Sequence, residues 1–261
     1  MKAIRFDLSG RTAMFKKPDV NLYYFTYNNI HKIALLGILG SILGLGGYTQ
    51  QNNKILDNCK KGQRAQKDFT EETRYPEFYQ KLKDLKVSIF PQEKGYFTKK
   101  IQVFNNCVGY ASKEQGGNLV VHEQWLENPK WTIYILDDNS IDEKLYQHLE
   151  DYLLNSKCEF IPYLGKNDHA ADIGNCKVVE LEKSNLNYIN SLFINENVEI
   201  GSYQYDEEEM PFFFKEIAPY SMNEEYNFYE FREFVMTNKE ISNVKELDNI
   251  YCTNGTSLAF F

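Results

Sequence analysis

Cysteine is scarce in this sequence, and no two cysteines lie close enough along the chain to form a zinc-binding pair. The 261 residues contain 5 cysteines, an odd number at wide spacing: Cys59, Cys107, Cys158, Cys176 and Cys252. Disulfide frameworks and zinc sites need closely spaced cysteines, usually in even number. The pattern therefore favours a reduced, cytoplasmic protein without a structural metal.

Long apolar segments are also missing. The longest apolar run covers residues 33–45, which is thirteen residues, whereas a helix that crosses a bilayer needs about 20. The opening MKAIRFDLSG alternates between polar and apolar residues and lacks the apolar core of a signal peptide. We therefore expect no membrane segment.

The common catalytic motifs are absent as well. The sequence contains no GxxxxGK[ST] phosphate loop, no HExxH zinc motif and no GxSxG turn. Metal-independent RNA cleavage needs a base, usually histidine, together with a cation or acid. The histidines are His31, His122, His148 and His169. Tyr27, His31 and Lys32 form one conceivable cluster, but a histidine at a helix start is more often a cap or a phosphate contact. The acidic run 206–209 is more typical of a solvated turn than of a cation site.

Positive charge is concentrated in the first part of the chain. Residues 1–115 contain 19 Lys and Arg against 10 Asp and Glu, a balance of +9, whereas residues 116–261 contain 10 against 27, a balance of −17. The basic part is able to meet a polyanion, and the acidic part a basic protein or only water. Charge alone leaves a second interpretation open, which is an unevenly charged solvated surface.

Hydrophobic periodicity indicates a mixed α+β chain. Alternation at 4–8 predicts a strand, and further strands are expected at 87–91, 99–104, 118–126, 131–136, 161–165 and 177–181. Helical spacing predicts helices at 31–45, 75–85 and 141–155. This order fits a ferredoxin-like βαββαβ sheet, a sheet that RNA-recognition domains often use for binding.

The first of these helices, HKIALLGILGSILGLGGY, contains interior glycines, although each one costs a helix roughly 1 kcal/mol relative to alanine. At 100° per residue the small residues share one face, opposite a ridge of leucine and isoleucine: Ala34, Gly37, Gly40, Ser41 and Gly44. We considered three occupants for this small face: another part of the same chain, a nucleic-acid backbone, or a partner subunit. We favour the sheet of the same chain for the glycines, and RNA or a partner for the helix start.

The same segments carry a family resemblance. MKAIRFDLSGRTAMFKKPDVN followed by FTYNNIHKIALLGILGSILGLGGY resembles the start of the Cas-five family, CRISPR-associated proteins of the RAMP superfamily. YPEFYQKLKDLKVSIFP is similar to the next helix and strand of that family. ENPKWTIYI and the later PYLGKNDHAADI resemble a second family signature. The resemblance covers most of residues 1–175, and the opening is most similar to members from type I-B systems.

The resemblance implies a fold and a function. It implies an α+β protein with a modified ferredoxin-like (RRM/RAMP) βαββαβ domain over residues 1–196, a thumb-like β-hairpin insertion around 99–125, and a β-rich C-terminal extension over 197–261 packed on it. It implies a subunit of Cascade, the cytoplasmic RNA-guided ribonucleoprotein of antiviral defence, which caps the 5′ handle of the CRISPR RNA. Its implied partners are the Cas-seven backbone subunit and the Cas-eight large subunit, with target DNA near the complex and no cofactor.

Two functions therefore remain in competition, and a third, weaker alternative is a soluble protein-interaction module that makes no contact with RNA. In one branch of the family, type I-C, the protein itself cuts the precursor RNA, whereas type I-B systems resemble those with a separate nuclease. We expect a non-catalytic RNA-binding subunit, with a metal-independent endoribonuclease as the alternative. Lysines can neutralise phosphates and aromatic rings can stack on bases. The predicted RNA-binding residues are Lys16, Lys17, Tyr27, Asn28, His31, Lys32, Lys99, Lys100, Asn105, Asn106, Tyr110 and Trp125, with Tyr24 as a further stacking candidate.

Overall fold

The computed structural model describes residues 1–19, 23–57, 70–106, 119–201 and 210–261. Its centre is a four-stranded antiparallel sheet in the order β4-β7-β1-β8. The strands are β1 (Lys2–Ser9), β4 (Val87–Pro91), β7 (Lys130–Asp137) and β8 (Asp172–Glu180), and the helices that connect them are α1 (Lys32–Ile42) and α4 (Glu143–Leu154). A helix follows β1 and another follows β7, so the connectivity is the βαββαβ pattern of a ferredoxin-like fold. The predicted α+β fold class is confirmed.

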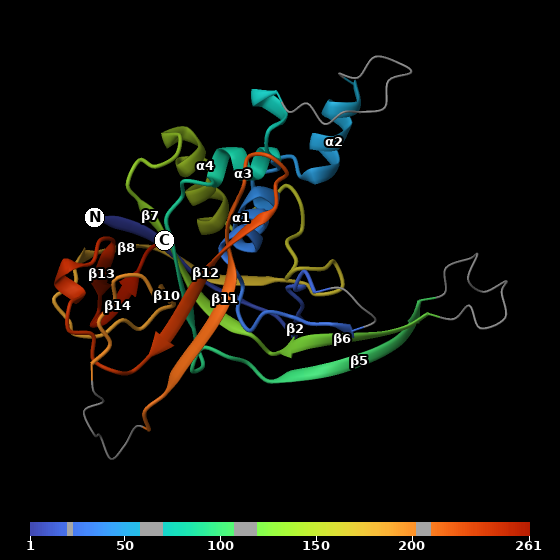
Figure 1. Cartoon of the computed structure of the whole chain (residues 1–261). Helices are drawn as coiled ribbons and strands as arrows, with labels where there is room; N and C mark the ends of the chain where they lie inside the picture. The colour runs from blue at the N-terminus through green and yellow to red at the C-terminus, as the bar shows by residue number, and fades with distance from the viewer. Residues whose placement is uncertain (20–22, 58–69, 107–118, 202–209) are drawn as a thin grey trace.

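One face of the sheet packs against the helices, as the alternation in β1 predicted. Ile4, Phe6 and Leu8 are completely buried. The leucine ridge of α1, including Leu35 and Leu39, is buried in the same core. Figure 1 shows α1, α3 (Glu77–Leu82) and α4 gathered on this side of the molecule.

The small face of α1 packs against a helix rather than against the sheet. A Cβ atom at Gly40 would lie 2.5 Å from Phe78 Cβ on α3, so only glycine allows this approach. Gly44 has a φ of +73° and lies just past the end of the helix, where a left-handed residue is common. Our expectation that the glycine face meets the sheet is therefore wrong, although close packing within the same chain is correct at Gly40.

The other face of the central sheet is covered by the C-terminal part of the chain. Ser88, Thr132 and Tyr134 on β4 and β7 are buried, and Leu258 and Phe260 lie in the core on this side. This covering removes the surface that an RNA-recognition domain would use over β4 and β7, so any RNA site must lie elsewhere.

The C-terminal part builds two small sheets, in the orders β10-β12-β11 and β14-β13-β9. Their strands are β9 (Glu182–Lys183), β10 (Phe193–Ile194), β11 (Phe213–Met222), β12 (Tyr229–Thr237), β13 (Ile250–Thr253) and β14 (Thr256–Ala259), with the 3-10 turn η3 (Val244–Glu246) between them. Because β9 and β10 belong to these sheets, the β-rich extension includes residues before the expected boundary at 197.

A long hairpin projects from the domain (Figure 1). It consists of β5 (Lys99–Asn106) and β6 (Leu119–Glu127), which pair antiparallel. At its base β6 also pairs with β2 (Thr12–Ala13) and, in parallel, with β3 (Tyr23–Tyr24). Apolar side chains lie exposed along it, with Ile101 63% accessible. The hairpin coincides with the expected thumb-like insertion, and its residues 107–118 lie outside the described part.

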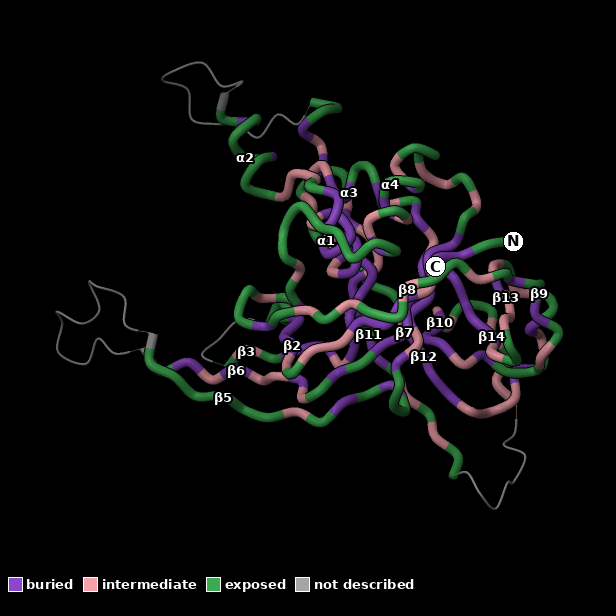
Figure 2. Tube along the Cα trace, turned by 180° about the vertical axis from the view of Figure 1, so that it is seen from behind, coloured by how far each residue is buried: buried purple, intermediate pink, exposed green. Residues whose placement is uncertain are grey.

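Two smaller elements complete the fold. The helix α2 (Tyr48–Asp57) and the 3-10 turn η1 (Glu71–Thr73) lie beside α1 and α3. Figure 2 shows that α2 is largely exposed and that the buried residues concentrate around α1 and the central sheet. Among the described residues no helix has both the length and the apolarity that a membrane span requires.

Candidate nucleic-acid interface

A groove of about 910 Å³ lies beside the exposed part of the small face of α1. Its floor includes Gly37 and Ser41, which follow one another along the same side of the helix. Its walls come from two segments far apart in sequence, residues 14–16 with Tyr24, and residues 160–166. The groove therefore exists only because the fold brings these segments to the same side of α1.

The first wall carries an exposed cation that rests on an aromatic ring. Residues 15–17 and 25–27 form a short antiparallel pair, with hydrogen bonds from Lys17 N to Phe25 O and from Tyr27 N to Phe15 O. This pairing places Lys16 Nζ 3.8 Å from the centre of the Tyr24 ring. A cation over a ring face is favourable, so Lys16 and Tyr24 offer a charge and a stacking surface side by side.

The second wall carries Lys166, which has a buried counter-charge. Lys166 Nζ lies 2.7 Å and 2.9 Å from the carboxylate oxygens of Glu123. Glu123 is buried on β6 and also accepts a hydrogen bond from Trp125 Nε1 at 3.0 Å. Tyr163 lines the same wall and is half exposed. The ion pair thus holds Lys166 in place at the groove and neutralises the charge of Glu123.

His31 lies at the helix start and lines the groove, although only 8% of it is exposed. It is the N-cap of α1, and its Nδ1 accepts a hydrogen bond from Ala34 N at 3.2 Å. The rings of Phe15, Tyr27 and Tyr229 surround the imidazole. Burial lowers the pKa of His31 from 6.5 to about 3, so the ring stays neutral at physiological pH.

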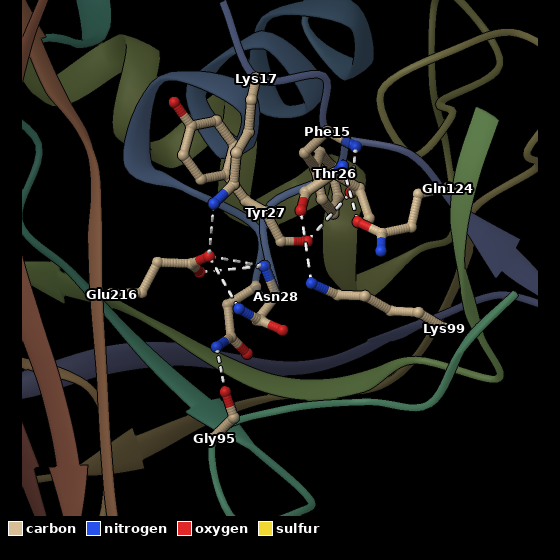
Figure 3. A network of polar contacts seen from close by, with 10 residues as sticks. Phe15, Lys17, Thr26, Tyr27, Asn28, Gly95, Lys99, Gln124 and Glu216 are labelled. Carbon is tan, nitrogen blue, oxygen red and sulfur yellow. Dashed lines mark hydrogen bonds and ion pairs between the residues drawn. The ribbon is translucent and has the colours of Figure 1, made fainter. Parts of the chain in front are cut away.

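A buried acid from the C-terminal extension ties the segment before α1 in place (Figure 3). Glu216 on β11 accepts hydrogen bonds from Asn28 N at 2.9 and 3.1 Å and from Asn28 Nδ2 at 2.8 Å. It also pairs with Lys17 Nζ at 3.4 Å. Lys99, at the base of the hairpin, donates to Thr26 O at 3.5 Å, and its burial lowers its pKa. The network joins the N-terminal segment, the hairpin base and the extension.

The predicted RNA-binding residues separate into surface and interior positions. Lys16 and Asn105 are exposed, and Lys100 at the hairpin base pairs with Glu127 at 3.3 Å. The side chain of Asn106 and all of Tyr110 lie outside the described residues.

Several of the predicted residues have internal roles instead. Tyr27 is 2% exposed, so its ring has no face free for a base. Lys32 is 6% exposed and lies 5.0 Å from the Tyr220 ring, and burial lowers its pKa to about 8. Trp125 packs edge-on against His169. We therefore remove Tyr27 and Lys32 from the interface, since their burial comes from long-range packing that sequence spacing does not reveal.

Sequence reasoning missed two important residues. Lys166 belongs to the YLGK turn that carried the family resemblance, and that turn was the available signal. Glu216 had no signal, because its partners precede it by 188 residues or more.

The remaining histidines are held by structural contacts. His169 is buried and its Nδ1 lies 2.6 Å from Thr12 Oγ1, while its Nε2 has no hydrogen-bond partner in the protein. His122 stacks on Tyr23, and His148 packs edge-on against Tyr152. Within the described ranges no group of three or more His, Cys, Asp or Glu side chains is arranged to hold a metal ion. The acidic run 206–209 lies outside those ranges.

Comparison with known proteins gives remote structural likenesses only. No protein-family model matches the sequence, and no curated protein matches it. The fold is similar to a chain of a CRISPR RNA-guided surveillance complex, with 12% identity over 93% of this chain and 92% of that one and a TM-score of 0.48. It is also similar to a CRISPR protein from Archaeoglobus fulgidus, with 10% identity over 99% and 98% and a TM-score of 0.44. A CRISPR-associated protein matches at 12% identity over 97% and 98%, with a TM-score of 0.37.

Proposed function

We propose that the chain is a subunit of an RNA-guided CRISPR surveillance complex, in which it binds the 5′ handle of the CRISPR RNA without cutting it. The observation that carries this proposal is the groove beside α1. It combines two lysines, exposed tyrosine rings and a smooth helical floor next to a projecting hairpin. The resemblance of the N-terminal segments and of the YLGK turn to the Cas-five family supports the same function.

The groove suits single-stranded RNA better than a duplex. Lys16 and Lys166 both line the groove, on neighbouring segments that the hydrogen bond from Met14 N to Leu164 O joins. Lys166 is paired with Glu123 and Asp168, so Lys16 is the lysine that would neutralise a phosphate. Tyr24 and Tyr163 offer ring faces for unpaired bases, and stacking of this kind contributes about 1–3 kcal/mol per base. Repulsion of the RNA by Glu123 is small, because Lys166 already compensates its charge.

The partners of the complex would contact other surfaces. The exposed apolar side chains of the hairpin, such as Ile101 and Val103, suit a protein neighbour. We assign this neighbour to the Cas-seven backbone subunit and place the Cas-eight large subunit and the target DNA nearby. Base pairing by the guide would supply sequence specificity, while this chain would hold the end of the guide.

The state of His31 favours binding over cleavage. With a pKa of about 3 the imidazole is a very weak base near neutral pH, and its Nδ1 is already occupied by the helix cap. Lys32 and Tyr27, the other members of the conceivable cluster, are buried away from the groove. A metal-independent endoribonuclease at this site therefore lacks a base of suitable pKa.

The binding proposal is tested by charge reversal at the groove. Lys16→Glu should reduce retention of the guide RNA and protection of its 5′ end in the assembled complex. Lys144→Glu, an exposed lysine on α4, is the control. Equal retention by the two variants would show that the groove is not the RNA face.

The absence of cleavage is tested separately. The chain is incubated with repeat RNA in EDTA, and we expect the RNA to remain intact. Site-specific cleavage that disappears in His31→Ala would establish the endoribonuclease instead.

A further inference from the structure

Gly37 is a glycine that the fold itself does not require. A Cβ atom at this position would meet nothing closer than Phe78 Cε2 at 4.0 Å, which is an ordinary contact. At Gly40, one turn later, the same atom would approach Phe78 Cβ to 2.5 Å. Gly37 also has ordinary helical φ, unlike Gly44. An interior glycine weakens a helix relative to alanine, so the fold alone would favour alanine at Gly37.

The space in front of Gly37 is the groove. Gly37 is partly exposed and lines the floor, whereas Gly40 is fully covered by α3. A ligand that lies over this part of the floor would therefore meet the bare backbone of Gly37. A missing side chain is useful where another molecule approaches a backbone closely.

A second, independent observation points to a ligand at the same place. His31 is more than nine-tenths buried, yet it lines the groove, ten residues or nearly three helical turns before Ser41. Because Nδ1 accepts the hydrogen bond from Ala34 N, the neutral ring must carry its proton on Nε2. Among the described residues Nε2–H has no protein acceptor, and it is not one of the fully enclosed unpartnered atoms. It is thus a hydrogen-bond donor with a fixed tautomer and with no partner in the described part of the chain.

We propose that Gly37 and His31 together form a seat for one nucleotide of the bound RNA, which lies across the Gly37 backbone and accepts a hydrogen bond from His31 Nε2–H. This inference rests on the proposed function, because it names how the same groove holds RNA. A group that binds at this place must be flat or narrow enough to lie on the Gly37 backbone, and it must carry an oxygen or nitrogen that accepts the hydrogen bond. A side chain at position 37 would occupy the space of that group.

The neutrality of His31 suits this role. A neutral donor fixes the position of an acceptor atom without adding a general attraction for phosphates, which Lys16 already supplies. Burial keeps the ring uncharged across physiological pH, so the donor does not change with ordinary variation of pH. The phenyl ring of Phe15 and the phenol rings of Tyr27 and Tyr229 hold the imidazole in one orientation.

The experiment separates binding from folding by adding one methyl group. Gly37→Ala is compared with Gly174→Ala, where an added Cβ has nothing within 4 Å and lies outside the groove. The probe is a single-stranded RNA with the 5′-handle sequence of the host's own CRISPR repeat, measured with the purified chain and with the assembled complex. We expect Gly37→Ala to melt at or above the wild-type temperature and to bind the RNA about tenfold more weakly. Gly174→Ala should bind like the wild type.

The histidine is tested by His31→Asn, since asparagine also caps helices but lacks a donor at the Nε2 position. We expect weaker RNA binding, by about threefold to tenfold, measured well below the melting temperature of the variant, which should fall because asparagine does not fill the space among the three rings. Wild-type affinity in Gly37→Ala would overturn the seat while leaving the proposed function intact. A fall in melting temperature for Gly37→Ala would also overturn it, because the glycine would then be structural. Failure of the wild-type chain and complex to bind the RNA would refute the proposed function itself.

Discussion

At the scale of single residues, the glycines in and just after α1 show that the same residue type can occur for a different structural reason at each position. Gly40 allows α3 to approach, Gly44 takes a left-handed φ past the helix end, and Gly37 opens onto the groove. A sequence pattern records only that all of them are small. The structure separates them because an added Cβ meets a different neighbour at each position.

The packing at Gly40 leads to the first prediction. Gly40→Ala forces a Cβ to within 2.5 Å of Phe78 Cβ, so α1 and α3 must separate or shift. We expect the free energy of unfolding to fall by about 1–3 kcal/mol, as overpacked sites generally do, in spite of the better helix propensity of alanine. Urea denaturation measures the change, and Gly174→Ala is the control. An unchanged midpoint would show that the two helices are not in close contact.

The buried histidine leads to a prediction about pH. The pKa of His31 falls from 6.5 to about 3 on folding, so only the unfolded chain takes up this proton between those values. The contribution of neutral His31 to the free energy of unfolding is therefore fully present above pH 6.5. Below that pH the free energy of unfolding decreases by up to roughly 1.4 kcal/mol per pH unit. Protonation would also remove the acceptor that caps α1.

The measurement is the free energy of unfolding in urea between pH 5 and pH 6.5, above the range where most carboxylates titrate. His31→Asn should flatten the dependence, because asparagine keeps a cap without titrating. Part of the dependence should remain, since burial and Lys166 also lower the pKa of His169. A variant at the solvated position His148 should behave like the wild type. The same steep dependence in His31→Asn would contradict a buried neutral His31.

At the scale of elements, β11 holds the segment that leads into α1 through hydrogen bonds and an ion pair, and we call this contact the clamp. Its Glu216 is only 8% exposed and satisfies the Asn28 backbone, the Asn28 amide and Lys17 together. These partners belong to the part of the chain that forms the first groove wall. The C-terminal extension therefore stabilises the geometry of the candidate RNA site through Glu216, and it also contributes Tyr229 to the lining of the groove.

This clamp predicts a large effect from a single substitution. Glu216→Ala leaves Asn28 N–H and Nδ2 without their acceptor and Lys17 without its counter-charge, so we expect a loss of about 2–5 kcal/mol in the free energy of unfolding. Glu233→Ala on the neighbouring strand β12 is the matched control, because that carboxylate lies near the surface. Chemical denaturation compares the two. A loss no greater than that of the control would mean that the network in Figure 3 contributes little.

The elements that sequence patterns predicted are those whose periodicity is local. The alternation in β1, the apolar β7 and the amphipathic α4 were all visible in the sequence, and their order was enough to predict the ferredoxin-like sheet. The aromatic segment 22–27 indicated an extended conformation, and β3 lies within it, whereas β2 falls in a segment predicted to be a loop. The partner of both strands was not predictable, because each pairs with β6 about 100 residues later. The site was predicted in part for the same reason. Lys16 lies in a basic loop, whereas the groove around it depends on α1 and on residues 160–166 meeting in space.

At the scale of the whole molecule, two features bear on where a polyanion could bind: the burial of one face of the central sheet and the uneven distribution of charge along the chain. The extension buries the second face of the central sheet over β4 and β7, so this part of the sheet does not offer a surface to a polyanion, whereas the groove beside α1 is open. The acidic excess lies in residues 116–261, and its members that meet the groove are neutralised locally, as Glu123 is by Lys166. A net charge of −8 is thus compatible with the proposed RNA binding at a groove where the acid is neutralised and Lys16 is exposed.

This arrangement predicts how salt should affect RNA binding. Each phosphate of a single strand that the protein neutralises contributes about −0.7 to the slope of log K against log salt concentration. Lys16→Gln should therefore make the slope shallower by about 0.7, whereas Lys144→Gln on α4 should leave it unchanged, although both variants have the same net charge. Lys166→Gln is best combined with Glu123→Gln, because the buried carboxylate would otherwise lose its cation. Fluorescence anisotropy of handle RNA across a salt series gives the slopes. Equal slopes for the Lys16 and Lys144 variants would mean that RNA responds to the overall charge of the molecule and not to the groove.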